Sequence, residues 1–396
     1  MKKLLLLVWL FTIIQLFLGG CPKPQPHKEG DILWSFSYSD PEDPEELASF
    51  TSSIFTIDPN GKVYIPAAEI PALLARYSTG GRRWEFTDPE EEEFALAAVM
   101  GDDGTIFIGT EGGKFYALTD SATVKCSTRF TSPVCVPPAL GADGTIFLQT
   151  DDDTLFALDP NTLNRKWAFY RGGGNYSPVI GSDGTVFTAQ EESLFALDPN
   201  SGQVKWGFVV RQPILASPAI DGSRGLVYVV DDDGWLTAVN LNDGSKEWEM
   251  KVGDGLSSPA IDGNGTVYIT AVGRLVAIDP VEQVEKWEFL IPGEYLLSMP
   301  AVSKEGVVYF LAAAEDMVDS LFAINAIDGT RRWATRLGIS ETIEEWVSAP
   351  KIGADGSIYV GSGKQAFCVM GKGGPAASSW PMFQGDARNS GRAGSY

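Results

Sequence analysis

The chain has 396 residues, with 52 acidic against 30 basic side chains and a formal net charge of −22. This charge argues against nucleic-acid binding, because no basic stripe is present to displace counterions from phosphates. The single histidine, His27, excludes the usual Ser-His-Asp and Cys-His catalytic sets and any multi-histidine metal site. With 44% hydrophobic residues, the chain can still build a substantial core.

The first residues are typical of an export signal. Two lysines precede an apolar run from Leu4 to Leu18, which is too short for an ordinary membrane span, and small residues lead to Cys21. The pattern resembles a bacterial lipoprotein signal, so we expect residues 1–20 to be a signal peptide and Cys21 to be acylated. Residues 21–28 would then form a semi-extended, proline-rich tether. An ordinary secretory signal with an incidental cysteine is the alternative.

The rest of the chain repeats one unit eight times. Short β-branched and aromatic strands recur after a glycine turn at Gly61, Gly104, Gly144, Gly184, Gly225, Gly265, Gly306 and Gly356. A second series marks the same period: Trp34, Trp84, Cys126, Trp167, Trp206, Trp248, Trp287, Trp333 and Trp380. Its ends are 346 residues apart over eight intervals, about 43 residues per unit, in the range of four-stranded propeller blades. The sequence therefore predicts an all-β, eight-bladed propeller of antiparallel blades.

Five units share a more detailed signature, with an Asp or Asn eight residues before the tryptophan: Asp159, Asp198, Asn240, Asp279 and Asn325. A short polar side chain there can bond the backbone of the following turn. We expect the indole to reach the neighbouring blade, burying its apolar face while its N–H finds a carbonyl. Trp34, Trp84, Trp167, Trp206, Trp248, Trp287 and Trp333 are the predicted docking residues. Cys126 and Arg76 depart from the pattern and suggest weaker contacts.

This arrangement resembles the tryptophan-docking repeat of pyrroloquinoline-quinone (PQQ) type propellers over residues 29–390. A tryptophan strand at residues 31–36 has no unit before it, and the last unit lacks one, so the N-terminal strand can close the ring. We expect the propeller to span residues 29–376. The tail, residues 377–396, would pack on the ring, outside its closed set of blades. A seven-bladed ring with a spare unit is the alternative.

The sequence predicts no catalytic residue, no metal ligand and no cofactor. Dehydrogenases with this repeat resemble one another in a calcium site, an aspartate base and a disulfide between adjacent cysteines. No two of the four cysteines here are adjacent. Cys126 and Cys135 are equally compatible with a disulfide and with free thiols. PQQ and calcium remain the cofactors of the alternative, a quinone- or sugar-binding envelope propeller that includes a PQQ-dependent dehydrogenase.

Connection lengths point to a binding surface. The connections after Trp34, Trp84 and Trp333 exceed those of the other units, and once the ring closes they lie side by side on one face. Loops longer than the minimum often carry function on a rigid scaffold. We therefore predict an acidic, aromatic-studded patch for a basic protein segment, made of Tyr38, Glu90, Glu91, Glu92, Glu93, Phe94, Glu344, Glu345 and Trp346. Solvated insertions without function are the alternative.

Together, the signal, the blade count and the repeats resemble the propeller lipoprotein subunit of the outer-membrane β-barrel assembly machinery. The resemblance implies a non-catalytic scaffold at the outer membrane that faces the periplasm. Its partners would be periplasmic or envelope protein domains, including barrel-assembly components. We expect a monomer held to the membrane only by its lipid anchor.

Overall fold

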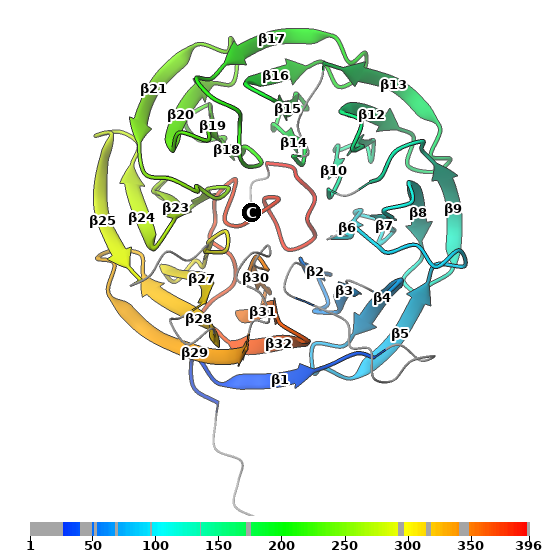
Figure 1. The fold of residues 1–396 in the computed structure, drawn as a ribbon, viewed down its shortest axis with the longest axis horizontal. Coiled ribbons are helices and arrows are strands. Elements are labelled where there is room, and N and C mark those ends of the chain that lie inside the picture. Colours follow the sequence, from blue (N-terminus) through cyan, green and yellow to red (C-terminus); the bar gives the residue numbers. More distant parts are fainter. Residues whose placement is uncertain are drawn as a thin grey trace, which may run out of the picture.

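The structure, a computed structural model, describes residues 27–39, 50, 54–67, 70–95, 97–134, 136–171, 176–291, 297–313, 318–339 and 348–393. These residues form eight four-stranded antiparallel sheets arranged as the blades of a closed ring (Figure 1). No helix in this part of the chain is long and apolar enough to cross a membrane. The predicted eight-bladed propeller is therefore confirmed.

Each blade places one strand at each of four distances from the ring centre. The innermost strands are β2 (Thr56–Ile57), β6 (Val99–Met100), β10 (Ala139–Leu140), β14 (Val179–Ile180), β18 (Ala219–Asp221), β22 (Ala260–Ile261), β26 (Ala301–Val302) and β30 (Lys351–Ile352). The second strands are β3 (Val63–Ala67), β7 (Ile106–Gly109), β11 (Ile146–Gln149), β15 (Val186–Gln190), β19 (Leu226–Val230), β23 (Val267–Ala271), β27 (Val307–Ala313) and β31 (Ser357–Ser362). The third strands are β4 (Ala72–Arg76), β8 (Lys114–Leu118), β12 (Thr154–Leu158), β16 (Ser193–Leu197), β20 (Trp235–Asn240), β24 (Arg274–Asp279), β28 (Val318–Asn325) and β32 (Gln365–Met370). The outer strands are β5 (Arg82–Thr87), β9 (Val124–Arg129), β13 (Arg165–Tyr170), β17 (Val204–Val209), β21 (Lys246–Lys251), β25 (Val284–Leu290), β29 (Arg331–Ile339) and β1 (Ile32–Phe36).

Blades 1 to 7 follow chain order, from β2–β5 to β26–β29. Blade 8 combines β30, β31 and β32 with β1, which pairs antiparallel to β32 as predicted. The two ends of the repeat array thus complete one sheet, and the ring leaves no terminal blade with an open face.

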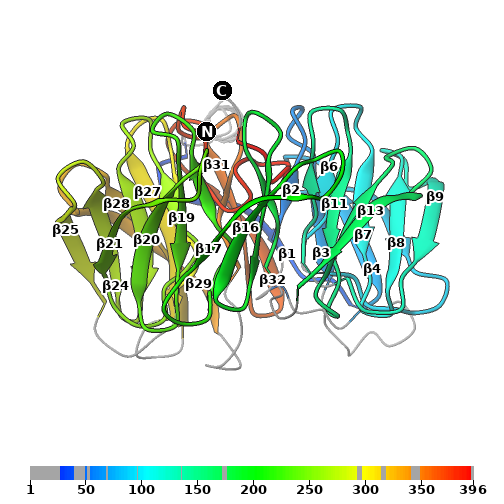
Figure 2. The ribbon, with the colours of Figure 1, turned by 90° about the horizontal axis from the view of Figure 1, so that it is seen from above.

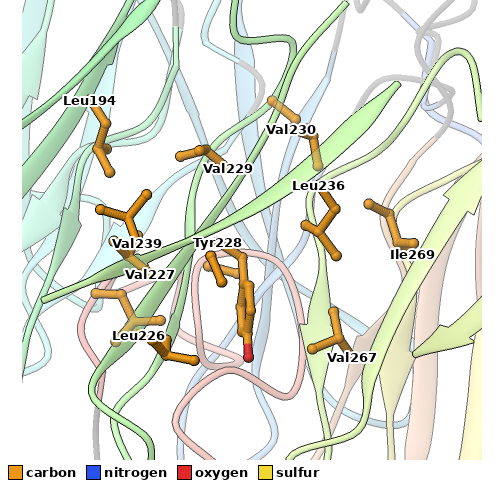
Figure 3. Close-up of a cluster of buried hydrophobic side chains, with 14 of the residues drawn as sticks. Leu194, Leu226, Val227, Tyr228, Val229, Val230, Leu236, Val239, Val267 and Ile269 are labelled. Carbon is orange, nitrogen blue, oxygen red and sulfur yellow. The ribbon is translucent and has the colours of Figure 1, made fainter. Parts of the chain in front are cut away.

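The core lies between blades. The second strand of blade 5, β19, is buried at all five positions, because neighbouring blades cover both of its faces. Figure 3 shows this packing, with Leu194 of blade 4 on one side and Val267 and Ile269 of blade 6 on the other. This two-sided burial explains why the second strands read as continuous apolar runs rather than alternating ones.

The tryptophans dock as expected. Indole N–H groups donate to a carbonyl of the next blade in five cases: Trp34 to Ser78 (2.7 Å), Trp84 to Asp120 (2.9 Å), Trp167 to Pro199 (2.8 Å), Trp206 to Leu241 (3.1 Å) and Trp287 to Ala326 (3.0 Å). The indole N–H groups of Trp248 and Trp333 are buried and have no acceptor among the described residues. All seven indole rings are buried or half-buried, whether or not the N–H group has an acceptor, so the hydrogen bond is not the shared feature.

The polar residue before each tryptophan shapes the turn that receives the preceding blade's indole. Asp159, Asp198, Asn240 and Asp279 each accept a hydrogen bond from the backbone N–H two residues later, at 2.9 to 3.1 Å. Asn325 differs, because its side-chain amide donates to the Thr330 hydroxyl at 2.6 Å. The predicted Asx-type turn is thus present in four of these five units.

The two departures from the pattern do not leave gaps. Trp34 keeps its bond to blade 1 although Arg76 replaces the aspartate, and Arg76 stacks over Phe36 at 4.4 Å. At the contact of blades 2 and 3, Cys126 has a free thiol 3.4 Å from the Asn161 carbonyl oxygen. Leu163 is buried there, at the turn position that is Gly202 in blade 4. The sequence analysis predicted weaker contacts at Cys126 but did not predict that Leu163 would fill part of this contact.

The C-terminal tail lies across the centre of the ring (Figure 1), a position that the sequence did not indicate. It runs along one face, here called the tail face, at the upper edge of Figure 2. Tail carbonyl oxygens accept hydrogen bonds from the last residue of six innermost strands: Ile57, Met100, Leu140, Ile180, Ile261 and Val302. The repeat period could not predict the position of the tail, because the tail is not a repeat unit and bonds the innermost strands of six different blades.

Blade 8 is tied to the tail by a side chain instead. Lys351, on β30, has no solvent exposure and donates to the carbonyl oxygens of Phe383 and Asp386, the latter at 3.1 Å. Burial lowers the pKa of Lys351 to about 7, although the nearby Asp386 carboxylate opposes the shift. Together with the backbone bonds, this lysine anchors the tail around the ring.

Candidate interaction surface

The face opposite the tail is built by two kinds of connection. The loops that lead from one blade to the next lie beside the turns that join the second and third strands. Backbone N–H groups of these turns donate to the loops: Glu111 to Glu93 (2.9 Å), Asp151 to Pro133 (3.0 Å) and Asp232 to Pro213 (2.9 Å). The sequence places carboxylates at both kinds of connection, so they gather on one side of the ring.

We call this side the acidic face. Its exposed carboxylates come from blades 2 to 5 and from the loop between blades 1 and 2: Glu90, Glu91, Glu111, Asp151, Asp152, Glu191, Glu192, Asp232 and Asp233. The aspartate and glutamate runs of blades 3 to 5 lie in the turns between the second and third strands. Glu111 escaped notice because it is a single acidic residue, although it holds the turn position of Asp151. This arrangement concentrates exposed carboxylates on this side of the ring, among exposed cations such as Arg171, Arg211 and Lys251.

The predicted glutamate loop is partly neutralised by its own neighbours. Lys114 lies 2.6 Å from Glu90, and Arg129 pairs with both Glu90 and Glu92, the latter at 2.6 Å. Partial burial opposes ionisation of Glu92, but hydrogen bonds from Thr110 and Arg129 hold its pKa below the ordinary value. Glu90 and Glu92 therefore serve local structure, although Glu90, like Glu91, remains exposed.

The aromatic half of the predicted patch is wrong for the two residues that the structure describes. Phe94 is only 4% exposed and packs with Phe86 and Tyr116, while Tyr38 is 9% exposed and joins the core around Phe50. Burial of a large apolar ring outweighs its position in a loop. Glu344, Glu345 and Trp346 lie outside the described residues.

Two carboxyls in the turns of this side, the buried Asp231 and the exposed Glu111, carry raised pKa values. Burial raises the pKa of Asp231, which is 1% exposed and accepts a hydrogen bond from the Trp235 backbone N–H at 2.9 Å. Burial and the neighbouring Glu93 raise the pKa of Glu111. Burial and a nearby like charge explain both shifts, so neither requires a catalytic role. Within the described residues, no group of three or more His, Cys, Asp or Glu side chains could hold a metal ion.

Two cavities open on the tail face, beside blade 2. One, of about 290 Å³, lies between blades 2 and 3, and the other, of about 390 Å³, between blades 1 and 2. Asp102 and Asp103 line both, and Arg392 and Arg388 of the tail line one each. Asp102 pairs with both arginines, at 3.4 and 2.5 Å. The cavities therefore form where the tail is clasped, and no tryptophan lines either of them for a quinone to stack on.

Solved structures share this fold. The crystal structure of BamB from Moraxella catarrhalis has a TM-score of 0.68 and 15% identity, covering 86% of this chain and 99% of that one. The C-terminal WD40 domain of Sif2 has a TM-score of 0.70 and 11% identity, covering 88% and 99%. Quinohemoprotein alcohol dehydrogenase from Comamonas testosteroni has a TM-score of 0.63 and 14% identity, covering 87% of this chain and 77% of that one. At these identities the likeness concerns the fold alone.

Curated relatives match over shorter stretches. Serine/threonine-protein kinase AfsK of Streptomyces griseus is 30% identical over 156 residues, which are 36% of this chain and 18% of the kinase. Outer membrane protein assembly factor BamB of Nitrosomonas eutropha is 30% identical over 112 residues, 28% of this chain and 26% of that protein. The matches thus span about a quarter or less of these relatives.

A family model covers far more of the chain. It matches residues 68–184, 172–280 and 248–374, which together exceed half of the sequence and run through the repeated blades. Its description is outer membrane protein assembly factor BamB. The chain therefore belongs to the BamB family of PQQ-type propellers.

Proposed function

We propose that the protein is a non-catalytic envelope lipoprotein, acylated at Cys21, that serves as a scaffold in the assembly of outer-membrane proteins. Its partner would present a basic segment to the acidic face. The observation that carries the proposal is the gathering of exposed carboxylates from four adjacent blades on one side of a rigid ring. The family and the signal-like N-terminus support the cellular setting.

Physical chemistry favours this kind of partner. A negative surface attracts a basic segment over about a Debye length and speeds its association. The rigid blades hold the turns in place, so little ordering of the scaffold opposes binding. The corrected burial of Tyr38 and Phe94 removes two of the expected aromatic contacts. We therefore expect the basic partner to be bound mainly through charge and main-chain contacts. Its affinity for the acidic face should fall as the salt concentration rises.

The test compares two charge-neutralised variants of the acylated chain. One replaces acidic-face residues (Glu192→Gln, Asp232→Asn and Asp233→Asn), and its matched control replaces exposed residues of the tail face (Glu247→Gln, Glu282→Gln and Glu305→Gln). Each protein is used to capture partners from detergent-solubilised envelopes, with mass spectrometry as the readout. We expect barrel-assembly components with the wild type and the control, and their loss with the acidic-face variant.

Two results would count against the proposal. Equal capture of barrel-assembly components by both variants would mean that the acidic-face carboxylates are solvated and do not bind the partner. If no envelope protein is captured reproducibly, titrations with quinone and calcium become decisive, because binding of either would restore the small-ligand alternative. Flotation of the wild-type chain with lipid vesicles separately tests acylation of Cys21.

A further inference from the structure

The turns between the third and outer strands reach the rim of the tail face, and their tips change character around the ring. In blades 3, 4 and 5 the tip residue is an asparagine: Asn161, Asn200 and Asn242. In blades 6 and 7 the same position is Val281 and Ile327, which are 66% and 88% exposed. Blade 1 exposes Tyr77 in this turn, at 48%. Single exposed apolar residues are ordinary, and Val124 and Val204, at the starts of β9 and β17, are 42% and 40% exposed. The exposed apolar side chains within the turns themselves, however, belong to one sector of the ring, in blades 6, 7 and 1.

That sector is where the chain enters the ring. Arg332 of blade 7 pairs with Glu29 at 2.8 Å and also donates to the Asn325 side chain at 3.4 Å, two residues before Ile327. On the other side, Trp34 of β1 donates to the Ser78 carbonyl, next to Tyr77. The entering segment therefore lies between the turn of blade 7 and the turn of blade 1.

The short segment between Cys21 and His27 limits how far the start of the described chain can lie from a lipid attached at Cys21. Cys21 and His27 are six positions apart, and a fully extended chain covers at most about 3.5 Å per residue, or roughly 20 Å. If Cys21 is acylated, His27 must stay within that distance of the lipid surface, and the turns of blades 7 and 1 flank the segment that follows His27. The polar asparagine tips belong to blades 3 to 5, which lie across the ring from the entering strand β1 (Figure 1).

We propose that this sector of the tail face rests on a zwitterionic lipid surface, with Val281, Ile327 and Tyr77 in the headgroup region. The proposal rests on the acylation of Cys21 in the proposed function. Valine and isoleucine contribute apolar area, and tyrosine suits the interface because its ring is apolar and its hydroxyl is polar. The net charge of −22 disfavours an anionic surface. The acidic face then points away from the membrane, toward the partner.

The experiment places a photo-crosslinking amino acid at one position at a time in the acylated chain: 281, 327 or, as the matched control on the same face, 161. Each protein is mixed with phosphatidylcholine vesicles, separated by flotation and irradiated, and lipid adducts are measured by mass spectrometry. We expect adducts at 281 and 327 at least about fivefold above those at 161, since only these tips enter the headgroups.

A second arm separates the anchor from the face. A chain that begins at Pro22 and carries an N-terminal histidine tag is bound to nickel-chelating vesicles, which supplies the tether without acylation. Adducts at 281 and 327 in this arm support the proposed contact even if Cys21 is not acylated and the native chain does not float. Adduct levels at 281 and 327 equal to those at 161, on vesicles that hold the protein, would overturn it.

Discussion

Exchanging the unusual pair at the contact of blades 2 and 3 tests how blades dock. Cys126 stands where seven blades have tryptophan, and it packs against the hydrophobic cluster that contains the buried Leu163. In the next contact, a Cβ built at Gly202 would lie 2.6 to 3.2 Å from the Trp167 ring. We therefore expect Cys126→Trp alone to destabilise the protein by about 1–3 kcal/mol through overpacking.

Leu163→Gly alone should also destabilise. Deleting a buried leucine side chain costs about 2–5 kcal/mol, and relief of its left-handed backbone, at φ 56°, returns about 1–2 kcal/mol. The double variant recreates the tryptophan–glycine pair of the other blades. It should be less destabilised than the sum of the single variants by about 2 kcal/mol or more.

Urea unfolding followed by far-UV circular dichroism provides the free energies for this double-mutant cycle. Far-UV dichroism is preferable to fluorescence, since the added tryptophan would change the emission signal. Additivity of the two single effects within about 0.5 kcal/mol would show that the two positions do not compensate one another. That result would refute the explanation given for the missing tryptophan.

Three further predictions concern the docking bonds and the tail. Trp167 and Trp248 are equally buried, but only the Trp167 indole has an acceptor, so Trp167→Phe should cost about 1 kcal/mol more than Trp248→Phe in urea unfolding; equal costs would contradict this. The unfolded chain holds the Lys351 proton up to pH 10.5 and the folded chain only to about 7, so this group makes stability rise with pH across that window, by at most about 1.4 kcal/mol per pH unit. Lys351→Met should flatten the rise in urea stability between pH 7 and 9, and an unchanged slope would mean that the lysine is hydrated. Deleting residues 377–396 removes six backbone acceptors, worth roughly 3–9 kcal/mol at 0.5–1.5 kcal/mol each; an unaltered Tm would show that the tail does not stabilise the ring.

Parts of the candidate surface followed from the sequence and parts did not. The glutamate loop before Phe94 was found because a long acidic connection is visible in the residues themselves. Its pairing with Lys114 and Arg129 was not, because those cations come from β8 and β9 and meet the loop only in the folded blade. The burial of Tyr38 and Phe94 was missed for the same reason, since the position of a residue in a loop does not reveal which side chains from other strands will cover its aromatic ring.

The repeated units let the sequence alone predict blade count, strand order, ring closure and the turns around Asp159 or Asp198. Each of these depends on local patterns that recur with a fixed period, so eight copies reinforce one another. Three features needed the tertiary structure: the tail across the centre, Leu163 in place of an indole, and the acidic face assembled from different blades. They depend on contacts between residues far apart in the chain, where neither period nor propensity indicates the partner.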